Sequence, residues 1–135
     1  MSVEANKALY RRFNATLNAI DWKKIDWDTI DRLLDETISD DYTYHHPSYA
    51  GFEPGPIGIK KWLRQVYSAI SDLHITVEDT FGEGDKLATR TSVKYVDLTT
   101  GKPMSGQTML ISHLRNGKIT DEWEMISEHL PIPGG

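Results

Sequence analysis

The sequence predicts an α+β fold, in which three N-terminal helices pack against one face of an antiparallel sheet. Before residue 70, apolar residues recur at steps of three and four, which is the spacing of helices with one buried face. After Asp72 the apolar period becomes two, as in strands, and short turns join the later segments. Helices followed by a hairpin-connected sheet indicate α+β rather than a parallel βαβ sheet. The length of 135 residues fits one domain over residues 1–135.

Each segment with helical spacing carries its own start signal. Ser2 can cap the first helix, and Asp26 or Asp28 can cap the second. Pro56 suits the first turn of the third helix, because its missing N–H needs no partner there. The predicted helices span residues 2–20, 26–38 and 56–70, and a short strand spans residues 42–46.

The second half of the chain reads as strands separated by turns rich in Gly, Asp and Thr. Asn116-Gly117 is the strongest hairpin signal, because both residues tolerate the positive φ of a two-residue turn. The last residues, from His129 on, are expected to be irregular. If the sheet curls, the space between it and the helices becomes a ligand pocket. The predicted strands span residues 73–78, 86–98, 102–115 and 118–128.

The composition disfavours several classes of function. A net charge of −5 argues against nucleic acid as a partner, because binding phosphates needs a surplus of Lys and Arg on one face. No run of about 18 apolar residues is present, so we expect no membrane partner. The absence of cysteine removes disulfides, thiol nucleophiles and thiolate metal sites. The five histidines are scattered, so no metal site is predicted, and a cytoplasmic protein is the simplest expectation.

Three segments, together with the order of the elements, resemble the SnoaL-like polyketide cyclase family: YTYHHP at residues 42–47, PIGIKKWL at 56–63 and RNGKITDEW at 115–123. The resemblance covers nearly the whole chain. It implies a cone-shaped fold, in which a curved antiparallel sheet packs against the three N-terminal helices and encloses a pocket, as in ketosteroid isomerase, scytalone dehydratase and nuclear transport factor two. It also implies ring closure by intramolecular aldol addition, without metal or cofactor, by an acidic residue near the end of the last strand.

The chain departs from the family pattern at that acidic residue. The pattern has an Asp four residues after Trp123, whereas this chain has Ser127, which cannot shuttle protons near neutral pH. The resemblance assigns a catalytic role to His45, and it places His113 where family members often carry an Arg. Trp62 and Trp123 match positions that border the cavity of the family, so both are expected to contact the substrate.

The last hairpin offers a substitute for the missing acid. With Asn116-Gly117 as a two-residue turn, Ser112 would pair with Asp121. The face that carries both residues is the more apolar one, so we expect it to line the interior. Burial would raise the pKa of Asp121 and make it a candidate proton shuttle. The alternative is an Asp that is hydrogen-bonded to Ser112 or lies at the wet mouth of the sheet.

Other features leave alternatives open. A β-bulge between residues 104 and 112 would reverse the hairpin faces and place His113 and Glu122 inside. His45 and His46 point to opposite faces of a strand, so only one can enter the pocket, and His45 is preferred. Arg90 could hold a carboxylate or polarise a carbonyl if it points inward, and otherwise it is an exposed sheet charge. Tyr44 and Ser127 complete the expected substrate-binding residues.

We therefore expect a cofactor-independent acid/base enzyme that acts on a small apolar or aromatic, polyketide-like or cyclic substrate. His45, His113 and Asp121 would move protons in aldol-type ring closure, isomerisation or dehydration. One alternative is a ring-opening or ether-forming hydrolase or cyclase of the epoxide-hydrolase type, which needs Arg90 and Asp121 in one cavity. Another is a non-catalytic small-molecule binder of the same fold, which Ser127 favours. We also expect a homodimer that forms through the outer sheet face.

Overall fold

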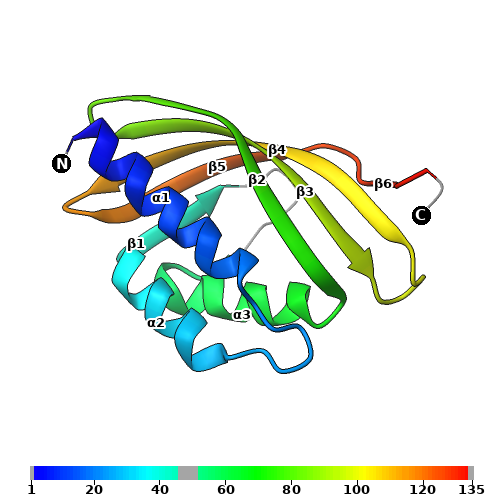
Figure 1. The fold of residues 1–135 in the computed structure, drawn as a ribbon. Coiled ribbons are helices and arrows are strands. Elements are labelled where there is room, and N and C mark those ends of the chain that lie inside the picture. Colours follow the sequence, from blue (N-terminus) through cyan, green and yellow to red (C-terminus); the bar gives the residue numbers. More distant parts are fainter. Residues whose placement is uncertain (1, 46–51, 134–135) are drawn as a thin grey trace.

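The computed structural model describes residues 2–45 and 52–133 and confirms the predicted α+β class. Three helices precede most of a six-stranded sheet (Figure 1). None of the helices in this described part of the chain is long and apolar enough to cross a membrane. The helices are α1 (Val3–Asn18), α2 (Trp27–Thr37) and α3 (Gly55–Tyr67), and the strands are β1 (Ile38–His45), β2 (Ile70–Glu83), β3 (Lys86–Asp97), β4 (Pro103–Arg115), β5 (Lys118–Ile126) and β6 (Leu130–Pro131).

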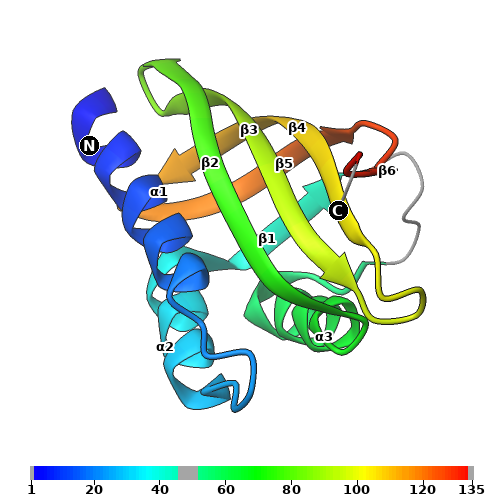
Figure 2. The same ribbon diagram turned by 45° about the vertical axis from the view of Figure 1, so that its right-hand side comes forward.

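The sheet has the strand order β1-β5-β4-β3-β2, and β6 pairs with β4 beyond the end of β5. Neighbours among β2 to β5 are antiparallel, as predicted, but β1 runs parallel to β5 and makes the sheet mixed. The reason is connectivity, because β1 lies between two helices and is not joined to β5 by a hairpin. The sheet curves over α1 and α3, which lie on its concave side (Figure 2).

The helices begin close to where the sequence predicts. The Ser2 hydroxyl accepts a hydrogen bond from the Ala5 N–H at 3.1 Å, and an Asp26 carboxylate oxygen accepts one from the Thr29 N–H at 3.1 Å. The third helix starts at Gly55 with a φ of +77°, one residue before Pro56. A Cβ at Gly55 would lie 2.6 Å from the Asp40 carbonyl oxygen, so the close approach of β1 also requires glycine here.

The solid part of the core lies where α2 meets β1 and the turn end of the β4–β5 hairpin. Leu34 and Ile38 are 0% and 1% exposed, and Leu114 and Ile119 cover them from the sheet. Each such buried aliphatic side chain stabilises the fold by about 1.5–3 kcal/mol relative to an exposed one. Leu34, Ile38 and Leu114 do not line the pocket described below, so this end of the cone is filled and the other end is hollow.

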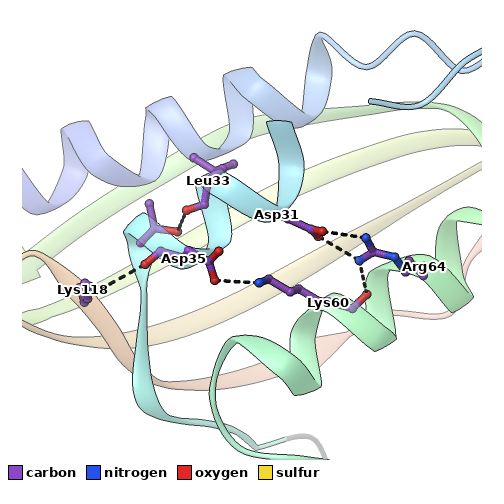
Figure 3. A network of polar contacts seen from close by, with 7 residues as sticks. Asp31, Leu33, Asp35, Lys60, Arg64 and Lys118 are labelled. Atoms are coloured by element: carbon purple, nitrogen blue, oxygen red, sulfur yellow. Dashed lines mark hydrogen bonds and ion pairs between the residues drawn. The ribbon is translucent and has the colours of Figure 1, made fainter. Parts of the chain in front are cut away.

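Charged side chains join α2 to α3 on the outside of the helical layer (Figure 3). Two nitrogens of Arg64 donate to the two carboxylate oxygens of Asp31 at 2.9 and 2.8 Å, and Lys60 donates to Asp35 at 2.7 Å. The guanidinium of Arg64 also lies 4.6 Å from the ring centroid of Trp27. The Arg64 hydrogen bonds lower the pKa of Asp31, which marks this pair as a favourable one.

We predict that Arg64→Ala lowers the free energy of unfolding by about 1 kcal/mol, because the variant loses a bidentate ion pair and a cation–π contact together. Urea denaturation at pH 7 measures the change. Lys61→Ala is the matched control on the same helix, because Lys61 pairs with Glu53 at 3.2 Å with a 69% exposed side chain. Equal losses in the two variants would show that the Arg64 network is no stronger than an ordinary surface ion pair.

Candidate active site

The β4–β5 hairpin carries an irregularity that decides which side chains face the pocket. Next to the Asn116-Gly117 turn, Arg115 pairs with Lys118 and Leu114 pairs with Ile119, as predicted. Beyond a register shift, His113 pairs with Asp121, so β5 holds one extra residue opposite β4. A β-bulge of this kind reverses the facing of every later residue on the bulged strand.

The predicted face of β5 is therefore wrong beyond the bulge. Asp121 and Trp123 lie on the outer face of the sheet, whereas Glu122 and Glu124 point to the concave side and line the pocket. The face predicted for β4 is correct, because Leu110, Ser112 and Leu114 are buried there. A bulge in β4 would have moved His113 inward, but the extra residue is in β5 and His113 stays outside.

The concave side of the sheet, together with α1 and α3, encloses a pocket of about 380 Å³. This volume is large enough for a drug-sized organic molecule. Most of its wall is apolar and aromatic, and its polar groups come mostly from α1, from strands β1, β3, β4 and β5, and from His129 near the C-terminus. The lining residues are Tyr10, Phe13, Asn14, Leu17, Tyr42, Tyr44, Phe52, Ile59, Trp62, Leu63, Val66, Tyr67, Ile70, Leu73, Ile75, Thr91, Val93, Tyr95, Thr108, Leu110, Ile119, Glu122, Glu124, Ile126 and His129.

Glu122 is the most strongly perturbed acid of the pocket. Its side chain is buried, and one carboxylate oxygen accepts a hydrogen bond from the Tyr42 hydroxyl at 2.7 Å. The other oxygen accepts one from the Ser112 hydroxyl at 3.2 Å. Burial raises the pKa of Glu122, the Tyr42 and Ser112 hydrogen bonds oppose this shift, and the charge of nearby Glu124 adds to it; together they give a pKa of about 7. Glu122 therefore gains and loses a proton near neutral pH.

A second carboxyl lies beside the first. Glu124 is two residues further along β5 on the same face, and one of its oxygens accepts a 2.5 Å hydrogen bond from the Tyr44 hydroxyl. Strand β1 runs parallel to β5 with Tyr44 opposite Glu122, which brings the inward tyrosines of β1 to the inward glutamates of β5. Two acids with two phenol donors are thus held on paired strands rather than on loops.

Helix α1 brings two further polar groups to these acids. Burial and the charges of Glu122 and Glu124 raise the pKa of Tyr10, so its hydroxyl keeps its proton and can donate. Asn14 lies one helical turn further along and is 6% exposed. Its side-chain nitrogen is buried and has no hydrogen-bond partner among the described residues. Both groups line the pocket and can donate to a ligand oxygen.

Four of the residues predicted to act in the site come together outside it. The ring of His45 stacks on Trp123 with centroids 4.5 Å apart, and His113 packs against Trp123 at 4.7 Å. The His45 Nε2 lies 3.2 Å from a carboxylate oxygen of Asp121. This cluster is on the outer sheet face, and none of its members lines the pocket. Asp121 and Trp123 lie outside because of the bulge in β5, whereas His113 lies on the outer face of β4, where the predicted register without a β4 bulge places it. The inward position predicted for His45 is wrong, because His45 follows the inward-facing Tyr44 on β1 and so points to the opposite face.

The other predicted site residues divide between the pocket and the surface. Tyr44 and Trp62 line the pocket. Arg90 lies on the outer face, where it forms an ion pair with Asp79 at 2.8 Å. The hydroxyl of Ser127 accepts from the Gln107 N–H at 2.9 Å and does not reach the pocket. His46 lies outside the described residues. Within residues 2–45 and 52–133, no three His, Asp or Glu side chains form a group that could hold a metal ion.

The sequence prediction missed Tyr42 and Glu124 and placed Glu122 only under an alternative. Strict alternation along β5 cannot reveal a one-residue bulge, so it predicted that Asp121 and Trp123, rather than Glu122 and Glu124, face the pocket. A signal did exist, because Tyr42 and Tyr44 alternate with the period of a strand and so share one face. The same is true of Glu122 and Glu124. Their pairing depended on the parallel register of β1 and β5, which no local pattern shows.

A curved, unclosed sheet over three helices with a deep pocket defines the class of cone-shaped α+β proteins that includes nuclear transport factor two. The family model of the SnoaL-like polyketide cyclases matches residues 7–129, so the chain belongs to that family.

Solved structures share this fold at low sequence identity. TsrD from Streptomyces laurentii is 22% identical, with a TM-score of 0.76 over 94% of this chain and 91% of that one. A SnoaL-like polyketide cyclase from Agrobacterium tumefaciens is 16% identical, with a TM-score of 0.74 over 95% and 94%. A protein of unknown function from Burkholderia pseudomallei that resembles nuclear transport factor two is 12% identical, with a TM-score of 0.75 over 94% and 92%. No curated protein matches the sequence.

The raised pKa of Glu122 predicts a specific pH dependence of stability. Between pH 4.5 and 7 the unfolded chain loses the Glu122 proton while the folded chain keeps it, so the free energy of unfolding falls as the pH rises and then levels above pH 7. The loss from this one group is on the order of 3 kcal/mol. Glu122→Gln keeps an acceptor for Tyr42 but has no carboxyl to titrate. We therefore expect the variant to lack this pH-dependent fall in the free energy of unfolding.

Urea denaturation of both proteins at several pH values measures the difference. Glu36→Gln on α2 is the control, because it removes a carboxyl that is exposed. The stability difference between Glu122→Gln and wild type should grow with pH, and that between Glu36→Gln and wild type should not. A constant difference for Glu122→Gln would contradict the raised pKa.

Proposed function

We propose that the protein is a cofactor-independent acid/base enzyme, and that Glu122 is its proton shuttle. Its substrate is a small, largely apolar carbonyl compound of polyketide-like or cyclic structure. The observation that carries the proposal is a buried carboxyl with a pKa near 7 on the wall of an apolar pocket. General acid/base catalysis is most effective when the catalytic pKa lies near the working pH, and burial is the usual means of raising that of a glutamate.

The proposed chemistry runs through an enolate. The Glu122 carboxylate removes a proton from a carbon next to the substrate carbonyl, and the electron pair moves onto the carbonyl oxygen. Tyr10 or Asn14 donates a hydrogen bond to that oxygen as its charge develops. In ring closure the enolate carbon forms a bond to a second carbonyl carbon of the same substrate, and the new alkoxide takes the proton back from Glu122. Return of the proton to another carbon gives isomerisation instead.

The family places its acid four residues after Trp123, where this chain has Ser127. Glu122 supports the same role from a different position, because the bulge in β5 turns it into the pocket. The ring-opening hydrolase alternative loses its support, since Arg90 and Asp121 are not pocket-lining residues. A non-catalytic binder would use the same apolar walls, and the experiment below separates it from an enzyme.

We predict that the wild-type protein accelerates exchange of hydrogen for deuterium at carbon 1 of 2-tetralone, a small bicyclic ketone. Glu122→Gln should lower this rate at least about 100-fold, because a general base contributes roughly that factor or more. The wild-type rate should rise through a midpoint near pH 7, as the base becomes ionised. Proton NMR in deuterated buffer follows the loss of the carbon 1 signal.

The neighbouring acid on the opposite face is the matched control. Asp121→Asn removes a carboxyl one residue away, on the outer side of the sheet, so exchange should continue at the wild-type rate. If wild type binds 2-tetralone without accelerating exchange, the protein is a binder. If Asp121→Asn loses the activity and Glu122→Gln keeps it, the assignment of the acid is wrong.

We also propose that two copies associate through the outer sheet face. Apolar side chains form two cross-strand pairs there, Met109 with Met125 and Ile111 with Trp123. Their exposed fractions are 63%, 64%, 49% and 40%, in that order. None of the three helices in residues 2–45 and 52–133 covers this sheet face, and a contiguous apolar area of this kind is typical of an interface.

Light scattering during gel filtration should therefore give the mass of a dimer for the wild type. Met125→Lys places a charge in the middle of this area and should shift the protein to a monomer, with the helical signal in circular dichroism unchanged. Ile57→Lys is the control, because Ile57 is 59% exposed on α3, away from the outer sheet face. A monomeric wild type would exclude this association.

A further inference from the structure

The C-terminal segment does not simply leave the sheet after β5. The Ser127 N–H donates to the Gln107 carbonyl oxygen at 2.9 Å, and the Ile132 N–H donates to the Pro103 carbonyl oxygen at 2.9 Å. Between these two points the chain forms β6 beside β4, at the end of the sheet far from the hairpin turn (Figures 1 and 2). The segment is therefore anchored at both ends, and His129 lies between the anchors.

The imidazole of His129 packs against Gly106, in a space that the side chain of any other residue at position 106 would fill. A Cβ at Gly106 would lie 2.0 Å from His129 Cδ2 and 2.5 Å from its Nε2. Gly106 is on β4 two residues before Thr108 and four before Leu110, and both of these line the pocket. Because alternate residues of a strand share a face, the imidazole lies on the concave side of the sheet. His129 itself belongs to the pocket wall.

Tyr95 holds this imidazole in one orientation. The Tyr95 hydroxyl and His129 Nδ1 are 2.6 Å apart, and both side chains line the pocket. Burial lowers the pKa of His129, which keeps the ring neutral, and burial followed by the charge of Asp97 raises the pKa of Tyr95. A neutral phenol is a stronger donor than a neutral imidazole N–H. Tyr95 therefore donates to Nδ1, and the ring proton is on Nε2.

The Nε2 atom is buried and has no hydrogen-bond partner in the described part of the chain. A buried donor without an acceptor costs about 1–3 kcal/mol, so a bound molecule that supplies an acceptor gains from the contact. His129 lies at Gly106, whereas Glu122 pairs with Ser112, six residues further along β4. At about 3.4 Å per residue this is a separation of about 20 Å between backbone positions.

We propose that His129, oriented by Tyr95, is a second polar contact for the ligand, and that the pocket selects elongated molecules with an apolar body and an oxygen acceptor at the end remote from Glu122. This inference rests on the proposed function of the pocket and names the class of its substrate. Such a molecule presents its reacting carbonyl to the acids of β5. Its far oxygen accepts a hydrogen bond from the His129 Nε2–H.

Two ketones that differ only at one far position, a CH2 group in one and an oxygen in the other, test the proposal: 6-(4-ethylphenyl)-2-tetralone and 6-(4-methoxyphenyl)-2-tetralone. The dissociation constant of each is measured by quenching of tryptophan fluorescence, since Trp62 lines the pocket. In the wild type the methoxy compound should bind about fivefold more tightly, as one added hydrogen bond allows. In His129→Phe, which removes both ring nitrogens, the two compounds should bind equally.

The ring tautomer gives a readout that does not depend on a ligand. Nitrogen-15 NMR of labelled histidine should show Nε2 protonated and Nδ1 unprotonated in the wild type, and Tyr95→Phe should remove this preference. A protonated Nδ1, or an equal methoxy effect in wild type and His129→Phe, would overturn the proposal. Deuterium exchange on 6-(4-ethylphenyl)-2-tetralone by the wild-type protein tests Glu122 separately, because this ketone has no far oxygen for His129 to contact. If the wild-type protein does not accelerate this exchange, the proposed function is wrong.

Discussion

One extra residue in β5 determines the chemistry of this pocket. Without the bulge next to the hairpin turn, the inner face of β5 would carry Asp121 and Trp123. With it, Glu122 and Glu124 face the pocket and meet the hydroxyls of Tyr42 and Tyr44 at 2.7 and 2.5 Å. The cost of burying the Glu122 carboxylate raises its pKa, and the hydrogen bonds from the Tyr42 and Ser112 hydroxyls keep that pKa near neutrality. The curved sheet and α1 then supply the apolar surroundings that burial requires.

The layout of the cone separates stability from function. The end around Leu34 and Ile38 is filled, and ion pairs such as Arg64 with Asp31 join α2 to α3 outside it. The hollow end contains the groups that handle protons. They are held by paired strands and one helix, so their geometry does not depend on a loop. The buried Glu122 carboxyl lowers the free energy of unfolding at pH values above the pKa that it has in the unfolded chain. The filled end of the cone offsets that loss.

Most of the fold was predictable, because helical and strand periods, caps and the Asn-Gly turn are local signals. The parallel pairing of β1 with β5 was not, since no hairpin or repeated pattern marks it. Trp62 was predicted at the pocket from the family pattern, and Tyr44 was also expected there, but the same pattern wrongly placed Trp123 at the pocket. Glu122 and His129 were not assigned, because one depends on a bulge and the other on a glycine that admits a distant imidazole. Both are contacts between segments rather than properties of one segment.

The proposed chemistry requires Glu122 to hold a proton close to neutral pH. Carbon-13 NMR of protein labelled at the glutamate side-chain carboxyl measures this directly, and the Glu122→Gln variant identifies the signal. We expect a titration midpoint near 7 for that carboxyl. A midpoint near the ordinary glutamate value of about 4.3 would show that Glu122 is a solvated or permanently paired carboxylate, and the proposed mechanism would be wrong.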